Sequence, residues 1–393
     1  MVSSTVLVGM SGGVDSSVAA ALLVEQGHHV IGITLNVWPE GAHGAVVERE
    51  DACCALGAVE DARRVCGQLG IPHYVVNFRE TFQRYVIQNF VDEYRRGRTP
   101  NPCVRCNQFI KFDALLAKAD VLGADLVATG HYARVTRAPG GRFALRRAVD
   151  QKKDQTYVLY VMTQDRLERA QFPLGGLTKE ETRQRAEDLG LHVAGKPESQ
   201  EICFVPTRDY RDYLREHDPT SLHPGPIRDT NGKVIGQHQG IAYFTVGQRR
   251  GLGLSSSRPL FVTEIWPDEN TLVVADEASL YRAEAWVNGT NWMSVEQLSA
   301  PMRVTAKPRY KAEEVPATIE PATEGGVHVR FDSPQRAVTP GQTIVFYDGD
   351  TVVGGGTLET DPTRPPDPQT PTVRTDAKAD PETRPSILAG RSV

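Results

Sequence analysis

The chain has 393 residues, which is too long for one domain of typical size and long enough to bury a large core. Its formal net charge of -5 gives no sign of nucleic-acid binding in bulk, so any RNA contact must come from local basic patches, such as Arg303, Lys307, Arg309 and Lys311. Six cysteines in a chain of this size exclude a secreted disulfide framework, and no signal peptide or long apolar run is visible. We therefore expect a cytoplasmic protein without a membrane segment, whose thiols are available for chemistry.

The first stretch that carries chemistry is GMSGGVDSS, residues 9–17. The apolar run 5–10 predicts a strand before it, four-residue spacing of Val14, Val18 and Leu22 predicts a helix after it, and residues 29–35 predict a second buried strand. Small residues let the backbone approach an anion closely, and the free N–H groups of the helix start then face that anion. The stretch predicts a nucleotide-phosphate cradle, with an ordinary strand-to-helix turn as the alternative.

Strands and helices then alternate. A helix is predicted to end at Gly70 with Cys66 on its buried face, followed by a strand over 74–78, a helix over 80–94 and a strand over 125–130. The alternation predicts a doubly wound parallel sheet, with ligands at the carboxyl ends of its strands. Residues 39–51 are expected to form a loop beside the nucleotide, Cys53 and Cys54 to pack, and residues 97–112 to form a shaped loop that carries Cys103 and Cys106.

The later sequence changes in character. Helix signals continue through a capping box at Thr178 and Glu181, after which short alternating segments such as 242–246 and 260–265 suggest strands. Short strands separated by Pro or Gly turns beyond residue 283 predict a small β-barrel. We expect an α/β domain over residues 1–206, a strand-rich middle domain over 207–282, a β-barrel over 283–360 and a disordered, proline-rich tail over 361–393.

The stretch SGGVDS resembles the PP-loop of ATP pyrophosphatases, which cleave ATP to AMP and pyrophosphate. Together with GRTPNPCVRCNQFIKF, ATGHYAR, KKDQTYVLY, ESQEICF, FTVGQRRGLG and TPGQTIVFY, it resembles the tRNA-specific 2-thiouridylase family of the bacterial MnmA type over about residues 2–360. The resemblance implies a PP-loop domain that replaces the C2 oxygen of a wobble uridine in tRNA with sulfur. In that reaction ATP adenylates the oxygen, and a sulfur nucleophile then displaces AMP.

The resemblance also implies roles for individual residues. Cys203 would carry a persulfide received from a cysteine desulfurase or a relay protein, and Cys106 would release the sulfur and leave a Cys106–Cys203 disulfide. ATP would be held with Mg²⁺, for which Asp15 is the expected partner; no resident metal site is predicted. The residues expected at the nucleotide are Gly9, Met10, Ser11, Gly12, Gly13, Val14, Asp15, Ser16, Leu35 and Gly130.

The implied tRNA contacts begin with Asn101, Pro102 and Cys103 at the target base, where many members of the family have Asp in place of Cys103. An acid–base role of that carboxylate therefore does not carry over. The further implied contacts are His131, Lys153, Asp154, Gln155, Arg309, Tyr310 and Gln342. His131 has the alternative role of a strand-end cap.

Three alternatives stay open at this stage. The same thiolation could use an iron–sulfur cluster on Cys103, Cys106 and Cys203, because three thiolates can leave one iron open to bind sulfide. Another PP-loop ligase, such as an argininosuccinate or guanylate synthetase, would need neither Cys106 nor Cys203. A non-catalytic ATP- or RNA-binding protein on the same sheet would bind ATP without releasing pyrophosphate.

Overall fold

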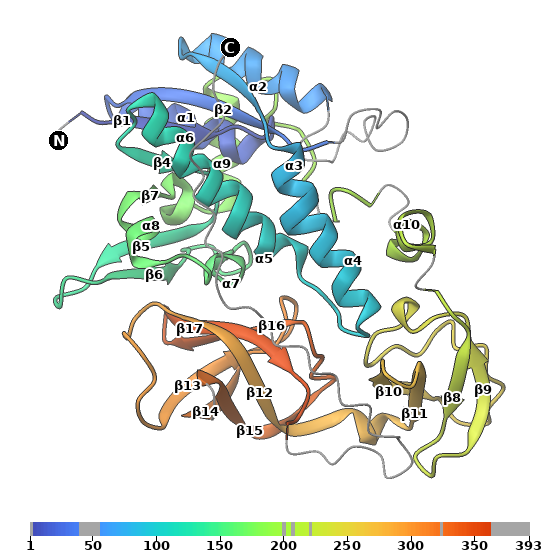
Figure 1. Ribbon diagram of the computed structural model, residues 1–393. Coiled ribbons are helices and arrows are strands. Elements are labelled where there is room, and N and C mark those ends of the chain that lie inside the picture. The colour runs from blue at the N-terminus through green and yellow to red at the C-terminus, as the bar shows by residue number, and fades with distance from the viewer. Residues whose placement is uncertain are drawn as a thin grey trace. The chain divides into compact units, whose positions relative to one another are not determined.

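Figure 1 shows the computed structural model, which describes residues 3–38, 56–198, 202–205, 209–219, 222–322 and 325–362. The predicted loop over 39–51, Cys53 and Cys54 lie outside the described residues, as does the predicted tail beyond residue 362. The described residues up to Asp361 belong to one compact unit. No helix within these ranges is long and apolar enough to cross a membrane.

A parallel sheet organises the N-terminal part of the chain. Its described strands run in the order β3-β2-β1-β4-β7, and every neighbouring pair is parallel. Along β1, Leu7 belongs to one core cluster while Val6 and Val8 belong to another, so the sheet is buried on both faces. This confirms the predicted doubly wound α/β sheet. The strand bounds are β1 Thr5–Gly9, β2 His29–Asn36, β3 His73–Asn77, β4 Leu126–Ala128 and β7 Ala170–Gln171.

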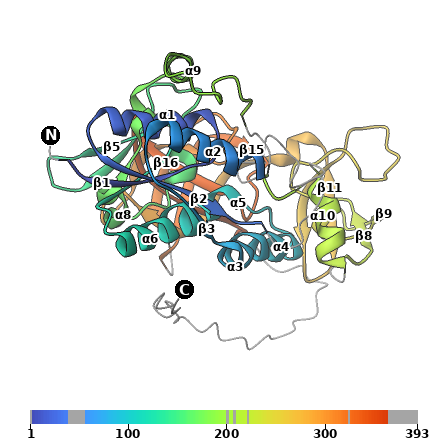
Figure 2. The ribbon, with the colours of Figure 1, turned by 90° about the horizontal axis from the view of Figure 1, so that it is seen from above.

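Helices cover both faces of this sheet. The helices α1 (Val14–Glu25), α2 (Leu56–Leu69) and α9 (Lys179–Asp188) contribute to the cluster that contains Val6, whereas α6 (Leu115–Leu122) packs with Leu7. Figure 2 shows α1 and α2 on one side of the strands and α6 on the other. Cys66 of α2 is fully buried in the core, as predicted, and burial raises the pKa of its thiol to about 11. The other described α-helices are α3 Arg79–Phe82, α4 Gln88–Arg95, α5 Pro102–Cys106, α7 Thr156–Leu159, α8 Gln164–Arg169 and α10 Tyr210–His217.

The predicted loop over residues 97–112 is wrong from Pro102 onward. Helix α5 begins there and runs into a π-helical segment, Asn107–Ala114, which continues as α6. The Asn101 side chain accepts a hydrogen bond from the Val104 N–H (3.3 Å), and Pro102 lies in the first turn, where a missing N–H costs no helical bond. Two prolines that look like helix breakers in the sequence therefore mark the start of a helix. A second π-helical segment, Gln83–Ile87, joins α3 to α4.

The rest of the chain is strand-rich, as predicted. Strands β10-β11-β8-β9 form one sheet, and β12-β15-β14-β13-β16-β17 form a barrel that β12 closes by pairing with β17. The expected strand over 242–246 is absent from the described structure, where Ile241–Tyr243 forms a 3₁₀ turn instead. The bounds are β8 Gly225–Arg228, β9 Val234–His238, β10 Phe261–Trp266, β11 Thr271–Ala275, β12 Tyr281–Trp292, β13 Met302–Lys307, β14 Val315–Pro321, β15 Val327–Arg336, β16 Thr343–Asp348 and β17 Thr351–Glu359.

The barrel contacts the N-terminal part of the chain in several places, and two of them bear on the site. The hairpin of β5 (Ala133–Arg137) and β6 (Phe143–Arg147) extends the barrel sheet, because Arg146 of β6 pairs with Thr351 of β17. Elsewhere the Gln342 amide donates to the carbonyl oxygens of Thr99 (3.0 Å) and Pro100 (3.2 Å). These bonds fix the segment that leads into α5 against the barrel.

Candidate active site

The turn between β1 and α1 has the geometry of an anion cradle. The Ser11 N–H donates to the Ser16 hydroxyl oxygen (3.1 Å), and Ser17 Oγ donates to the Gly13 carbonyl (2.8 Å). Gly13 precedes the helix in an extended conformation and no side chain caps the helix start. The N-terminal end of α1 therefore keeps its backbone N–H groups and its positive dipole end available for a ligand.

Two predicted nucleotide residues are glycines because the chain packs tightly there. Gly12 has a φ of +67°, and a Cβ at this position would lie 2.1 Å from the Ala58 carbonyl oxygen. A Cβ on Gly130 would lie 2.6 Å from the Ser16 nitrogen, so β4 ends directly against the first turn of α1. Leu35 lies near the end of β2 and packs, half-buried, between two core clusters. The fold thus brings all the predicted nucleotide residues to one edge of the sheet.

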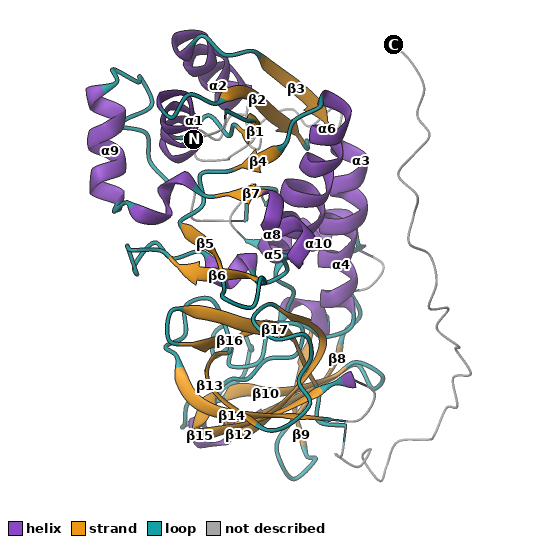
Figure 3. Ribbon diagram, turned by 90° about the vertical axis from the view of Figure 1, so that its left-hand side faces the viewer, coloured by secondary structure: helices purple, strands orange, loops and turns teal. Residues whose placement is uncertain are grey.

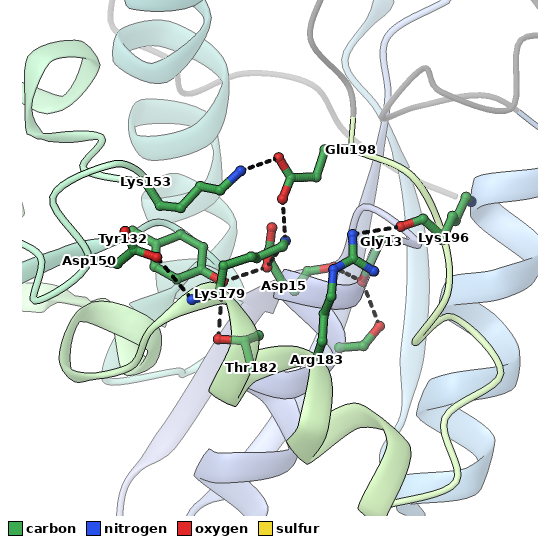
Figure 4. Close-up of polar contacts among 12 residues, drawn as sticks. Gly13, Asp15, Tyr132, Asp150, Lys153, Lys179, Thr182, Arg183, Lys196 and Glu198 are labelled. Carbon is green, nitrogen blue, oxygen red and sulfur yellow. Dashed lines mark hydrogen bonds and ion pairs between the residues drawn. The ribbon is translucent and has the colours of Figure 1, made fainter.

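Charged side chains from three other segments converge on this loop (Figure 4). Asp15 Oδ1 accepts from Lys179 Nζ (2.7 Å) and from the Tyr132 hydroxyl (2.9 Å). Lys179 also pairs with Glu198 (3.0 Å), which pairs in turn with Lys153 (2.7 Å). Burial works to raise the pKa of Glu198, but hydrogen bonds from both lysines lower it, so the carboxylate is ionised at neutral pH. The result is an alternating chain of charges from the cradle to Lys153.

A second lysine reaches the cradle from the segment after α9. Lys196 Nζ donates to the Gly12 carbonyl (3.1 Å) and pairs with Asp61 of α2 (2.7 Å). Lys179, Lys196 and Glu198 are absent from the residues that the sequence predicted. The sequence could have indicated Lys179 as a site residue. A basic residue in the first turn of a helix is unfavourable for the helix dipole unless a carboxylate pairs with it.

The donor set fits a magnesium ion carried by a nucleotide rather than a metal cage. Mg²⁺ commonly takes one or two carboxylates together with phosphate oxygens. The two bonds of Asp15 fall on Oδ1, and a third of its side chain is exposed, so Oδ2 is available as a ligand. In the described parts of the chain, no three His, Cys, Asp or Glu side chains are grouped to hold a metal.

The two predicted catalytic cysteines lie against one hydrophobic cluster. Cys106, at the end of α5, and Cys203 are both half-buried and pack on the cluster containing Phe82, Phe90 and Phe204. Phe204 makes edge-to-face contacts with both Phe82 and Phe90, with ring centroids 5.8 and 5.1 Å apart. Cys103 is exposed on the same short helix. The fold thus brings Cys106 and Cys203 from distant parts of the sequence to a common apolar surface.

Several predicted tRNA contacts have structural partners. Asp154 is buried and accepts from the Ala148 N–H (3.0 Å), and burial raises the pKa of its carboxyl group. Gln155 Oε1 accepts from the Tyr132 N–H (2.9 Å). His131 is also buried, with Nδ1 2.6 Å from the Thr129 hydroxyl, and burial lowers its pKa well below the usual value. Lys153, by contrast, is a third exposed at the end of the charge chain.

The predicted tRNA contacts on the barrel and at the start of α5 also divide into exposed side chains and side chains with structural partners. Arg309 and Tyr310 are exposed in the turn after β13, and the Tyr310 ring lies 5.6 Å from that of Tyr157. Gln342 holds the segment before α5, as described above. Asn101 and Pro102 shape the start of α5, where Pro102 is buried and Cys103 points to solvent.

Comparison with known proteins gives matches along the chain. Three family models match: tRNA methyl transferase HUP domain over residues 4–207, tRNA methyl transferase PRC-barrel domain over 211–276 and aminomethyltransferase beta-barrel domain over 282–358. A protein named tRNA-specific 2-thiouridylase MnmA from Acetivibrio thermocellus is 51% identical over 355 residues, covering 90% of this chain and 99% of that protein. A Clostridium perfringens protein of the same name is 51% identical over 359 residues, covering 91% and 99%. A solved 4-thiouridine synthetase–RNA complex with bound ATP has a TM-score of only 0.31, at 18% identity over 56% of this chain and 51% of that one, so we draw nothing from it.

Proposed function

This chain belongs to the tRNA-specific 2-thiouridylase family, and we propose from that membership and from its site that it thiolates C2 of the wobble uridine in tRNA. The methyl transfer in the names of two family models has no counterpart in the names of the relatives that match almost the whole chain. The observation that carries the proposal is the combination of a phosphate cradle with two thiols on one apolar surface.

The first half of the reaction would occur at the cradle. Backbone N–H groups at the start of α1 and the cations Lys179 and Lys196 would hold the phosphates of ATP. Asp15 would hold a nucleotide-borne Mg²⁺, which offsets phosphate charge. The C2 oxygen of the uridine would attack the α-phosphate and expel pyrophosphate, so that AMP becomes the leaving group in place of a poor oxide. A preorganised donor to developing charge is worth roughly 3–4 kcal/mol in such a step.

The second half would use the two thiols. The terminal sulfur of a Cys203 persulfide would attack C2 and displace AMP, which leaves the uridine joined to Cys203 through two sulfur atoms. The Cys106 thiolate would then attack the Cys203 sulfur, free the thiocarbonyl and form a Cys106–Cys203 disulfide. The two electrons that reduce the transferred sulfur come from the cysteine pair. A cysteine desulfurase or relay protein would supply the persulfide, and a reductant would reopen the disulfide.

The iron–sulfur alternative makes a different demand on Cys103. It requires Cys103, Cys106 and Cys203 as joint ligands, whereas Cys103 is exposed and the other two cysteines pack on the aromatic cluster. These three thiols do not form a metal-ligand group in the described structure, so we derive no step through a cluster. Cys103→Ala separates the two schemes: retained activity without stoichiometric iron after anaerobic purification supports the persulfide, and loss as complete as in Cys106→Ala, with bound iron, supports the cluster.

The proposed function is tested by mass spectrometry of tRNA nucleosides before and after incubation with ATP, Mg²⁺ and a sulfur source. We expect 2-thiouridine to form together with pyrophosphate. Cys66→Ala is the matched control, because this buried thiol has no access to RNA. Pyrophosphate release without 2-thiouridine would point to another PP-loop ligase, and ATP binding without pyrophosphate release would refute the enzymatic assignment of the site.

A further inference from the structure

A polar cavity of about 530 Å³ lies between helices α4 and α5 and the barrel. Figures 1 and 3 both show these helices beside the end of the barrel that β16 and β17 border. The cavity is within the size range of small-ligand sites, roughly 300–1,000 Å³. Its walls include Asn89, Arg105, Gln108, Thr163, Asn288 and Asn291.

Helix α5 separates this cavity from the thiols. Asn101, Val104, Arg105 and Gln108 line it, and their spacing of three and four residues places them on one face of the helix. Cys103 and Cys106 are three residues apart on the other face. Neither cysteine nor any residue of the phosphate cradle lines the cavity. The cavity is therefore a second site, on the face of α5 opposite the cysteines, and it shares Asn101 with the predicted target-base residues.

Arg105 is a cation of the cavity wall that takes no part in its ion pairs among the described residues, although the carboxylate of Glu93 favours its charged form. The other two arginines in its wall have carboxylate partners: Arg98 pairs with Glu93 and Glu359, and Arg166 with Asp113. Arg105 has no carboxylate partner among the described residues. Its Nε donates to the Tyr85 carbonyl (3.4 Å), and its guanidinium lies over the Phe109 ring, 4.5 Å from the centroid. A half-buried guanidinium without a direct ion pair is suited to bind an anion from outside the chain.

One neutral polar group of the cavity lacks a partner, whereas the Asn291 amide donates to the carbonyls of Tyr160 (2.6 Å) and Met162 (2.9 Å). Thr163 Oγ1 is buried and has no hydrogen-bond partner within the described structure. The carboxamide side chains that line the cavity come from α4, from the π-helical segment after α5 and from β12. Such groups donate and accept in one plane, which matches the edges of nucleobases. The cavity therefore combines a phosphate-type charge with base-type hydrogen bonding.

We propose that this cavity binds one unpaired nucleotide of the RNA substrate next to the target uridine. Arg105 contacts its phosphate, and the carboxamides of Asn89, Gln108 and Asn288 contact its base. Helix α5 then stands between the two splayed nucleotides, with the target on the cysteine face. Sequence-specific recognition of RNA loops commonly uses such splayed bases. This inference rests on the proposed function, because it takes tRNA as the substrate.

The test measures binding of anticodon stem-loop RNAs to the full chain by fluorescence anisotropy at fixed salt. One RNA is intact, and two others lack the base on the 5′ or the 3′ side of the target uridine. We expect the wild-type protein to lose about ten-fold in affinity for one of the two abasic RNAs, within the range for a single base contact. The double variant Arg105→Gln, Gln108→Ala should bind intact RNA about ten-fold more weakly and show no further loss with that abasic RNA.

Arg84→Gln is the matched control, because Arg84 lies over the Tyr85 ring and does not line the cavity. It should keep the abasic discrimination of the wild type. Gln108→Ala alone provides a milder variant if the double variant unfolds, and it should reduce the discrimination. The proposal is overturned if the wild type binds all three RNAs equally, or if the variants keep its full abasic penalty.

The proposed function is tested separately, by measuring 2-thiouridine that the wild-type protein forms on the intact stem-loop RNA. Abasic discrimination without thiolation would support the cavity and refute the reaction. Thiolation without discrimination would refute the cavity alone.

Discussion

The two ends of the candidate active site differ in polarity. Around the phosphate cradle, Asp15, Lys179, Glu198 and Lys153 form a chain of paired charges at 2.7–3.0 Å. Around the thiols, Cys106 and Cys203 pack on an apolar cluster of aromatic and aliphatic side chains. A charged, fixed environment suits the handling of a polyphosphate, and an apolar one keeps water away from a persulfide.

The ion pairs at the polar end connect nucleotide binding to the thiol end. Lys179 already has two carboxylate partners, so a phosphate must compete with Asp15 or Glu198 for it. Glu198 lies in the same segment as Cys203, five residues before it in the sequence. We therefore expect that nucleotide binding at the polar end changes the ion pair between Lys179 and Glu198 and, through it, the position of Cys203, the proposed sulfur carrier. The following substitutions separate the two ends.

The largest effect is expected at the thiols. Cys106→Ser and Cys203→Ser should each abolish 2-thiouridine formation, because a hydroxyl can neither carry a persulfide nor close a disulfide. Both variants should still bind ATP within about two-fold of the wild type, since the cradle lies elsewhere. Nucleoside mass spectrometry and ATP titration give the two readouts. Thiolation by the Cys203→Ser protein would contradict the assignment of sulfur transfer to the thiol end.

At the cradle, Lys179→Met should lower kcat/KM for ATP by about 10²–10³-fold, as expected when one preorganised contact to developing charge is lost. Pyrophosphate release from tRNA-bound enzyme measures this. Lys152→Met is the matched control, because Lys152 is an exposed neighbour of Lys153 that forms no ion pair with the described residues, and its kcat/KM should stay within about two-fold. A variant with normal pyrophosphate release would show that Lys179 serves only to neutralise Asp15.

A feature of the structure can be predicted from the sequence where the residues that determine it lie close together in the chain. The strands, the helices of the sheet and the glycine-rich cradle follow from periodicity and small residues, and Gly12 and Gly130 show why: a Cβ there meets backbone. Helix α5 was missed because its start depends on a cap by Asn101, which outweighs the appearance of two prolines. Lys179 and Lys196 were missed because their partners lie far away in the sequence. The roles assigned to individual residues and the domain boundaries stay predictions.

A smaller effect is expected where the barrel meets α5. Gln342→Ala removes two hydrogen bonds to the carbonyls of Thr99 and Pro100, worth about 1 kcal/mol each. We expect KM for tRNA to rise about three- to ten-fold, because the segment before Asn101 is less well positioned, while ATP affinity is unchanged. Gln335→Ala on exposed β15 is the control. If ATP affinity fell as much as tRNA affinity, Gln342 would support the cradle rather than RNA recognition.

The smallest expected effect concerns the buried His131, whose ring lies near those of Phe112 and Phe172. Burial and the nearby Lys111 hold the pKa of this imidazole well below its usual value, so the His131 side chain is neutral in the folded protein. The unfolded chain takes up a proton near pH 6.5 and the folded chain does not, so this histidine lowers stability as the pH falls through that value. Its full contribution to the slope is about 1.4 kcal/mol per pH unit below pH 6.5.

His131→Gln should therefore flatten the fall in unfolding free energy between pH 7 and pH 5.5. His73 and His238 have pKa values that are also lowered by burial, so the wild-type slope includes their contributions and only the difference between the two proteins belongs to His131. Chemical denaturation at each pH gives this difference, and His28→Gln is the control. An unchanged slope in His131→Gln would mean that the imidazole takes up its proton in the folded protein as readily as in the unfolded chain.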